Sequence, residues 1–317
     1  MWLSYLHKRT PGATFLFVVI VLVLLTITII QPIIQFLNGQ TTLTTPPHYL
    51  FLPLIGLLLA SFCNRVYVIA DTFEKATFWP GYFYAFLLFN IIGQTSSYEA
   101  LTHGTLAILI TYELLKIHFN STALKNTYNL GMYMGLAFML KSEMIFAIPF
   151  LLYAITNLKP LNFREYMLYF LGIVTPLYFL YAYCFLVDDF NLWNNLLPYE
   201  TWFQFSSTIS ILNWIQWGLV IIFMTAVLFL TFIQYNSLPV YIRRMSSAML
   251  FIIGAITLIA MVSSFSGFLI FYLAPAFTFF ATMLMLKYSK NPRLELIHII
   301  FVLIIIGTQL LSTFVQL

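Results

Sequence analysis

Long uninterrupted runs of apolar residues follow one another along this chain and decide what it can fold into. Phe15–Ile30 and Phe251–Val262 contain no charged residue, and similar runs recur along the chain. A membrane-spanning helix needs about 20 predominantly apolar residues. The strands of a transmembrane barrel would instead alternate apolar and polar residues over stretches of about 10. The continuous runs therefore predict an all-α protein, a polytopic bundle of transmembrane helices.

The composition supports lipid as the solvent of this chain. Hydrophobic residues make up 62% of the 317 positions and charged residues only 8%, whereas soluble domains carry about 25% charged residues. The net charge of +4 is small and scattered, so no nucleic-acid partner is expected. Cys63 and Cys184 both lie in apolar runs, so we expect no disulfide framework, no metal site and no cofactor.

The apolar runs predict about eleven spans within one transmembrane domain over residues 1–317. The spans are 12–34, 49–64, 77–94, 100–117, 122–140, 143–157, 166–187, 213–234, 247–262, 266–286 and 295–315. The longest connection, Asp188–Asn213, is rich in aromatic residues. Tryptophan and tyrosine prefer the level of the lipid headgroups, so this connection is predicted to lie at the outer surface.

The basic residues predict the orientation, because short cytoplasmic loops carry an excess of lysine and arginine. With the N-terminus inside, 13 of the 14 basic residues are cytoplasmic and only Lys141 lies outside. Merging 122–140 and 143–157 into one kinked span would instead put seven basic residues outside, so two spans are favoured. An odd number of spans then leaves the C-terminus outside. The predicted location is the inner (plasma) membrane, with the lipid bilayer as the first partner.

Charged residues on the predicted outer side form a candidate polar site. Its members are Glu99, Lys141, Glu143, Asp188 and Asp189. Lys141 is predicted either to bind a phosphate or carboxylate as a point charge, or to reach the headgroups and pair with Glu143. Asp188 and Asp189 are either ligands of a divalent cation or a solvated pair at a helix end. The solvated pair is favoured because the sequence offers no further metal ligands near Asp188 and Asp189. No residue of the candidate site is assigned a catalytic role.

Other polar and special residues favour packing roles. Glu113 and His103 lie near the inner and outer ends of the span at 100–117, and a lone histidine is predicted to be a hydrogen-bonded packing residue. Gly131 and Gly135 form a G-x-x-x-G pattern that allows close helix approach, within the chain or with a partner. Three prolines are predicted to kink their spans and to aid packing. They are Pro149, Pro176 and Pro275.

The segment Tyr128–Tyr181, under a fifth of the chain, carries a resemblance to known families. It reads Gly131…Gly135-Leu136-Ala137…Leu140-Lys141-Ser142-Glu143…Pro149, then Lys159-Pro160-Leu161-Asn162-Phe163-Arg164-Glu165, then Gly172…Thr175-Pro176. The first part resembles the helix–turn–helix of GT-C-type glycosyltransferases, which use lipid-linked sugars. The whole segment is similar to an uncharacterised family of bacterial polytopic inner-membrane proteins, loosely labelled carotene-monooxygenase-like.

The sequence departs from what these resemblances imply. The transferases place a catalytic or metal-binding carboxylate in the first outer loop, but Gln35–His48 contains no acidic residue. Glycosyl transfer with a general base or a metal needs such a group, so related chemistry would have to be rebuilt around Glu99, Asp188 or Asp189. No set of histidines for iron supports the oxygenase label.

Three functions follow from the sequence as hypotheses. The favoured one is a non-catalytic component of cell-envelope assembly or export, with other envelope membrane proteins as partners. The first alternative is a GT-C-like glycosyltransferase that acts on a lipid-linked substrate, with Lys141 at the lipid phosphate. The second is a transporter or flippase, although such proteins usually show charges near the midplane and inverted repeats, and neither is evident here.

Overall fold

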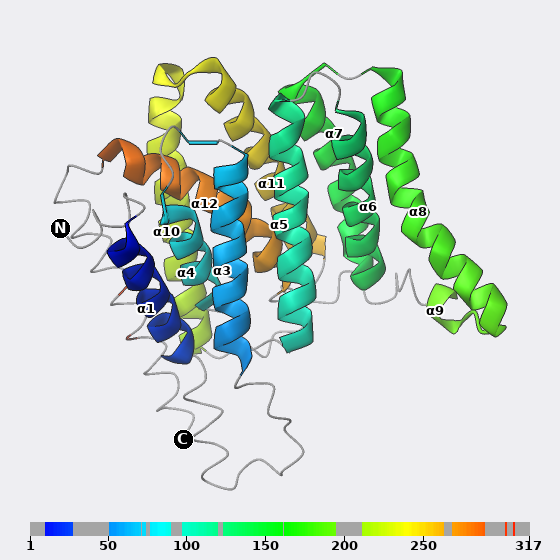
Figure 1. Ribbon diagram of the computed structural model, residues 1–317, viewed down its shortest axis with the longest axis horizontal. Helices are drawn as coiled ribbons and strands as arrows, with labels where there is room; N and C mark the ends of the chain where they lie inside the picture. Colours follow the sequence, from blue (N-terminus) through cyan, green and yellow to red (C-terminus); the bar gives the residue numbers. More distant parts are fainter. Residues whose placement is uncertain are drawn as a thin grey trace, which may run out of the picture. The chain divides into compact units, whose positions relative to one another are not determined.

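The computed structural model describes residues 10–27, 51–70, 72–73, 77–89, 97–119, 123–160, 162–194, 211–262, 268–288, 302 and 307. These residues form helices and contain no strand, which confirms the all-α prediction (Figure 1). The helices are α1 (Pro11–Ile27), α3 (Leu52–Ile69), α4 (Trp79–Phe89), α5 (Ser97–Phe119), α6 (Leu124–Leu140), α7 (Ala147–Leu158), α8 (Phe163–Val187), α9 (Asn191–Asn194), α10 (Ile211–Gln234), α11 (Val240–Val262) and α12 (Phe268–Tyr288). Short 3-10 turns lie at Ser142–Phe146 and Tyr235–Ser237.

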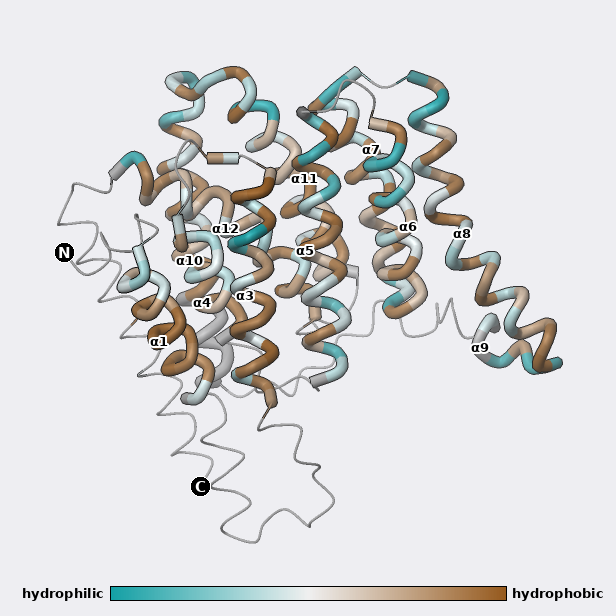
Figure 2. Tube along the Cα trace, in the orientation of Figure 1, coloured by the Kyte–Doolittle hydropathy of each residue, from teal (hydrophilic) through white to brown (hydrophobic). Residues whose placement is uncertain are grey.

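Six helical segments in the described part of the chain are long and apolar enough to cross a membrane. They are Leu52–Ile69, Tyr98–His118, Phe163–Val187, Val220–Ser237, Val240–Met261 and Phe268–Lys287. Figure 2 shows hydrophobic residues along most of α8, with hydrophilic residues towards its two ends. These six segments match six of the predicted spans. The total of eleven and the orientation stay predictions, and 295–315 lies outside the described residues except for two positions.

The described helices belong to two compact units. Unit 1 contains Met1–Thr102, Ser207–Leu238 and Phe277–Leu317, and unit 2 contains His103–Ser206 and Pro239–Ala276. In unit 1, α3 packs against α4, and α1 packs against both. Aromatic rings fill its core, where Tyr67 lies 6.5 Å and Phe73 lies 5.7 Å from Phe279, measured between ring centroids.

In unit 2 the chain reverses between α6 and α7. Lys141 follows the end of α6 with an extended backbone (φ −144°, ψ 112°), and the 3-10 turn after it leads directly into α7. Tyr169 of α8 lies against Gly131 of α6, and its hydroxyl donates to the carbonyl oxygen of Ile148 in α7 at 3.1 Å. Residues before and after Lys141 therefore approach the same tyrosine, so α6 and α7 are two helices and not one kinked helix. That each of them spans the membrane stays a prediction.

Glycines bring α6 and α8 into backbone contact. A Cβ atom on Gly131 would collide with the carbonyl oxygen of Tyr169, and a Cβ on Gly135 would lie 2.6 Å from that of Ile173. Gly172 of α8 completes the contact, because a Cβ there would collide with the carbonyl oxygen of Tyr128. The G-x-x-x-G pattern thus serves packing within the chain.

The prolines play different parts in the helices. Pro176 and Pro275 lie inside α8 and α12, as predicted. Pro149 lies instead in the first turn of α7, next to the 3-10 turn. The first N–H groups of an α-helix have no partner within that helix, so proline is tolerated there.

Candidate functional site

A mixed aromatic and basic group lies where α6 ends and α12 begins in unit 2. Its members are His103, Lys141, Phe268 and Tyr272, which we call the Lys141 cluster. His103 is 2% exposed, and its Nδ1 lies 3.1 Å from the hydroxyl of Tyr272. Phe268 lies one turn before Tyr272, and its ring centroid is 5.3 Å from that of His103. A buried imidazole needs a hydrogen-bond partner, so His103 is the packing residue that the sequence predicts.

Lys141 rests on an aromatic ring. Its Nζ lies 5.2 Å from the ring centroid of Phe268, a contact that stabilises by about 0.5–2 kcal/mol depending on solvation. Among the described residues, Lys141 forms no ion pair with Glu143. Glu143 is half-buried in the turn that opens into α7, where its charge complements the start of a helix. The pairing of Lys141 with Glu143 is therefore not observed.

Asp188 and Asp189 lie at the far end of α8, and both are exposed. Asp188 ends the helix in the left-handed conformation (φ 55°, ψ 33°). Asp189 accepts a hydrogen bond from the backbone N–H of Asn191 at 2.9 Å and so caps the start of α9. The described geometry is that of a solvated pair at a helix end.

The stagger of α6 against α8 separates these aspartates from Lys141. The two helices run parallel, with Gly131 beside Tyr169 and Gly135 beside Ile173. If both helices continue with this alignment, Lys141 at the end of α6 lies level with Phe179 of α8. Asp188 follows Phe179 in the same helix and therefore lies roughly 13 Å further along α8, at 1.5 Å per residue. Of the five predicted site residues, Lys141 and Glu143 are thus neighbours and the aspartates lie apart. Glu99 is exposed in unit 1, and its place in the site stays a prediction.

A buried carboxylate joins α5 to α6 at the other end of unit 2. Glu113 is 5% exposed and accepts hydrogen bonds from the amides of Asn126 at 2.7 Å and Asn129 at 3.0 Å. Sequence reasoning noted Glu113 but missed its partners. The two asparagines could have indicated this contact, because residues three apart in a helix share one face and an otherwise mostly apolar helix has few other polar side chains there.

A second buried carboxylate joins the ends of three helices, α6, α7 and α8, at the same end of unit 2. Glu165 is 2% exposed. Its Oε1 accepts from Lys159 Nζ at 2.9 Å and from the backbone N–H of Ala123 at 3.2 Å. Its Oε2 lies 3.3 Å from the backbone N–H of Asn162. The end of α7 and the starts of α6 and α8 therefore meet at one side chain.

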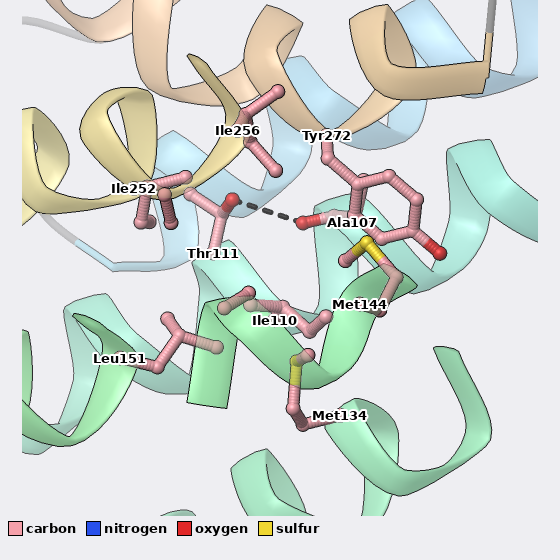
Figure 3. A pocket seen from close by; sticks show the side chains of 11 residues that line it. Ala107, Ile110, Thr111, Met134, Met144, Leu151, Ile252, Ile256 and Tyr272 are labelled. Atoms are coloured by element: carbon pink, nitrogen blue, oxygen red, sulfur yellow. Dashed lines mark hydrogen bonds between the residues drawn. The ribbon is translucent and has the colours of Figure 1, made fainter. Parts of the chain in front are cut away.

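A small cavity lies in unit 2, and Tyr272 is part of its wall (Figure 3). Its volume is about 20 Å³, and methionine, isoleucine, leucine and alanine side chains form most of the lining. The hydroxyl of Thr111 is already bonded to the carbonyl oxygen of Ala107 at 2.9 Å. A cavity of this size holds about one water-sized molecule, so it offers no room for a sugar.

Comparisons with known proteins find no match to this chain among family models, curated proteins or solved structures. The resemblance noted in Tyr128–Tyr181 therefore stays an expectation.

Proposed function

We propose that this chain is a multi-pass protein of the inner membrane that acts as a non-catalytic component of cell-envelope assembly or export. One observation carries this proposal: buried charged and polar side chains of unit 2 join one helix to another. Glu113 joins α5 to α6, Glu165 joins three helix ends, and His103 joins α5 to α12. Such cross-links suit a rigid scaffold. The proposed topology has eleven spans, with the N-terminus inside and the C-terminus outside.

The outward face of α8 supports a scaffolding role. Phe179 is 67% exposed and Leu186 is 82% exposed, and other large apolar residues accompany them along the helix. Without water in the bilayer core, helices associate by close packing of their surfaces. In this proposal a helix of another envelope protein packs on this face.

Purification in mild detergent tests the proposal. The tagged protein is expected to retain one membrane partner at fixed stoichiometry. The variant Phe179→Ala/Leu186→Ala should lose at least half of that partner, whereas Phe229→Ala, an exposed phenylalanine on α10, should retain it. A chain that is always recovered alone would contradict the proposal. A different pair of results would instead support the glycosyltransferase: the protein is recovered without a partner, and cells with Lys141→Ala lose an envelope glycan. Lys141 forms no ion pair with a described carboxylate, so its charge would be available to a lipid phosphate.

A further inference from the structure

One end of unit 2 gathers basic side chains from five helices. They are Lys116, Lys125, Lys159, Arg164, Arg243 and Arg244, and we call this region the basic end. The contacts of Glu113 and Glu165 bring together the end of α5, the starts of α6 and α8 and the end of α7. Asn157 of α7 donates to the hydroxyl of Ser247 in α11 at 2.7 Å, so the start of α11 lies at the same end.

The positive charge of the basic end exceeds its described negative charge. The two described acidic residues there, Glu113 and Glu165, are buried and engaged by asparagine amides, Lys159 and backbone N–H groups. Lys125, Arg164 and Arg244 are exposed, and none of them forms an ion pair with a described residue. Three basic side chains therefore face outwards uncompensated within the part of the chain that the structure describes.

These three residues lie near the starts of their helices. Lys125 and Arg164 are the second residues of α6 and α8, and Arg244 is the fifth residue of α11. The first turn of a helix carries partial positive charge, so a basic residue within it is unfavourable unless an acidic residue offsets it. The first turn of α8 contains Glu165, but that of α6 contains no acidic residue. Helix stability therefore does not explain the placement of Lys125, but an anionic partner outside the protein would.

We propose that the basic end binds the phosphate groups of anionic phospholipids. Lys125, Arg164 and Arg244 lie near the starts of α6, α8 and α11, which the proposed topology places at the level of the lipid headgroups. Arginine offers paired N–H donors that match phosphate oxygens, and each basic residue near an anionic lipid surface strengthens binding about fivefold. The inference rests on the membrane embedding in the proposed function but not on a protein partner.

Lipid binding to the purified, delipidated protein tests this inference. Native mass spectrometry with phosphatidylglycerol or phosphatidylcholine in the micelles measures the affinity for each lipid. The variant Lys125→Gln/Arg164→Gln/Arg244→Gln is expected to bind phosphatidylglycerol roughly 100-fold more weakly than the wild type. Tyr183→Phe, which changes an exposed residue towards the other end of α8, should bind as the wild type does. Should the triple variant not fold, Arg164→Gln alone is expected to show about a fivefold loss.

Three outcomes would overturn the inference. One is equal binding of the two lipids by the wild type, and another is full phosphatidylglycerol binding by the folded variants. The third is displacement of the lipid by millimolar inorganic phosphate, which would assign the basic end to a free anion. Failure to capture a protein partner would contradict the proposed function alone, because this binding is measured without one.

Discussion

Gly131→Ala is expected to destabilise unit 2 by about 3 kcal/mol. The new Cβ would collide with the carbonyl oxygen of Tyr169, and α8 would have to move away from α6. Overpacking typically costs about 1–3 kcal/mol. The upper part of that range applies here because the obstacle is backbone, which cannot change rotamer.

Cys184 provides the measurement for this variant. It is a free, buried cysteine on α8, so a thiol-reactive dye reports when the helix separates from its neighbours during heating. Cys63 is replaced by serine so that the signal comes from unit 2. Gly254→Ala is the matched control, since its Cβ would lie 3.8 Å from the ring of Phe150, an ordinary contact. Melting of Gly131→Ala at or above the wild-type temperature would contradict the close α6–α8 contact.

Glu165→Ala is expected to cost about 2–3 kcal/mol, because leaving buried hydrogen-bond donors without an acceptor costs about 1–3 kcal/mol, and more where one of them is charged. The ammonium of Lys159 and the backbone N–H groups of Ala123 and Asn162 would all lose the carboxylate of Glu165 as an acceptor. The ends of three helices would then separate more readily.

The same dye assay on Cys184 measures this loss. Arg164→Ala is the control. Arg164 lies next to Glu165 in the chain, but its side chain is exposed, and substitutions of exposed residues usually change stability by less than about 0.5 kcal/mol. Glu165→Gln should fall between the two, since it keeps an acceptor oxygen but not the charge. Equal melting temperatures for Glu165→Ala and Arg164→Ala would contradict the role of Glu165 as a joint between helices.

The helices could be predicted from sequence because the signal for each of them is local. Continuous apolar runs predicted α8, α11 and α12, and the distribution of basic residues predicted the reversal at Lys141. The partners of buried polar groups could not be predicted in this way. His103 and Tyr272 are 169 residues apart, and Gly172 matters only because α8 lies beside α6. A sequence pattern shows which face of a helix is polar, but not which helix will cover it.

The candidate site shows the same limit. Lys141 and Asp188 were grouped because both are predicted on the outer side. The register of α6 against α8 and the 25-residue length of α8 separate them along the bundle axis. The alignment of α6 with α8 depends on which glycines of the two helices come into contact, and the sequence of one helix alone does not show this.

Labelling at the two ends of α8 tests the membrane-spanning architecture most directly. The helix has 25 residues, about 37 Å at 1.5 Å per residue, enough to cross a hydrocarbon core of about 30 Å. Arg164→Cys and Asp189→Cys are made in a chain without its native cysteines. A membrane-impermeant maleimide is added to cells whose outer membrane has been permeabilised. We expect Asp189→Cys to react and Arg164→Cys to react only after the inner membrane is opened. Labelling of Arg164→Cys from outside, alone or as readily as Asp189→Cys, would contradict an α8 that crosses the membrane with its basic end inside.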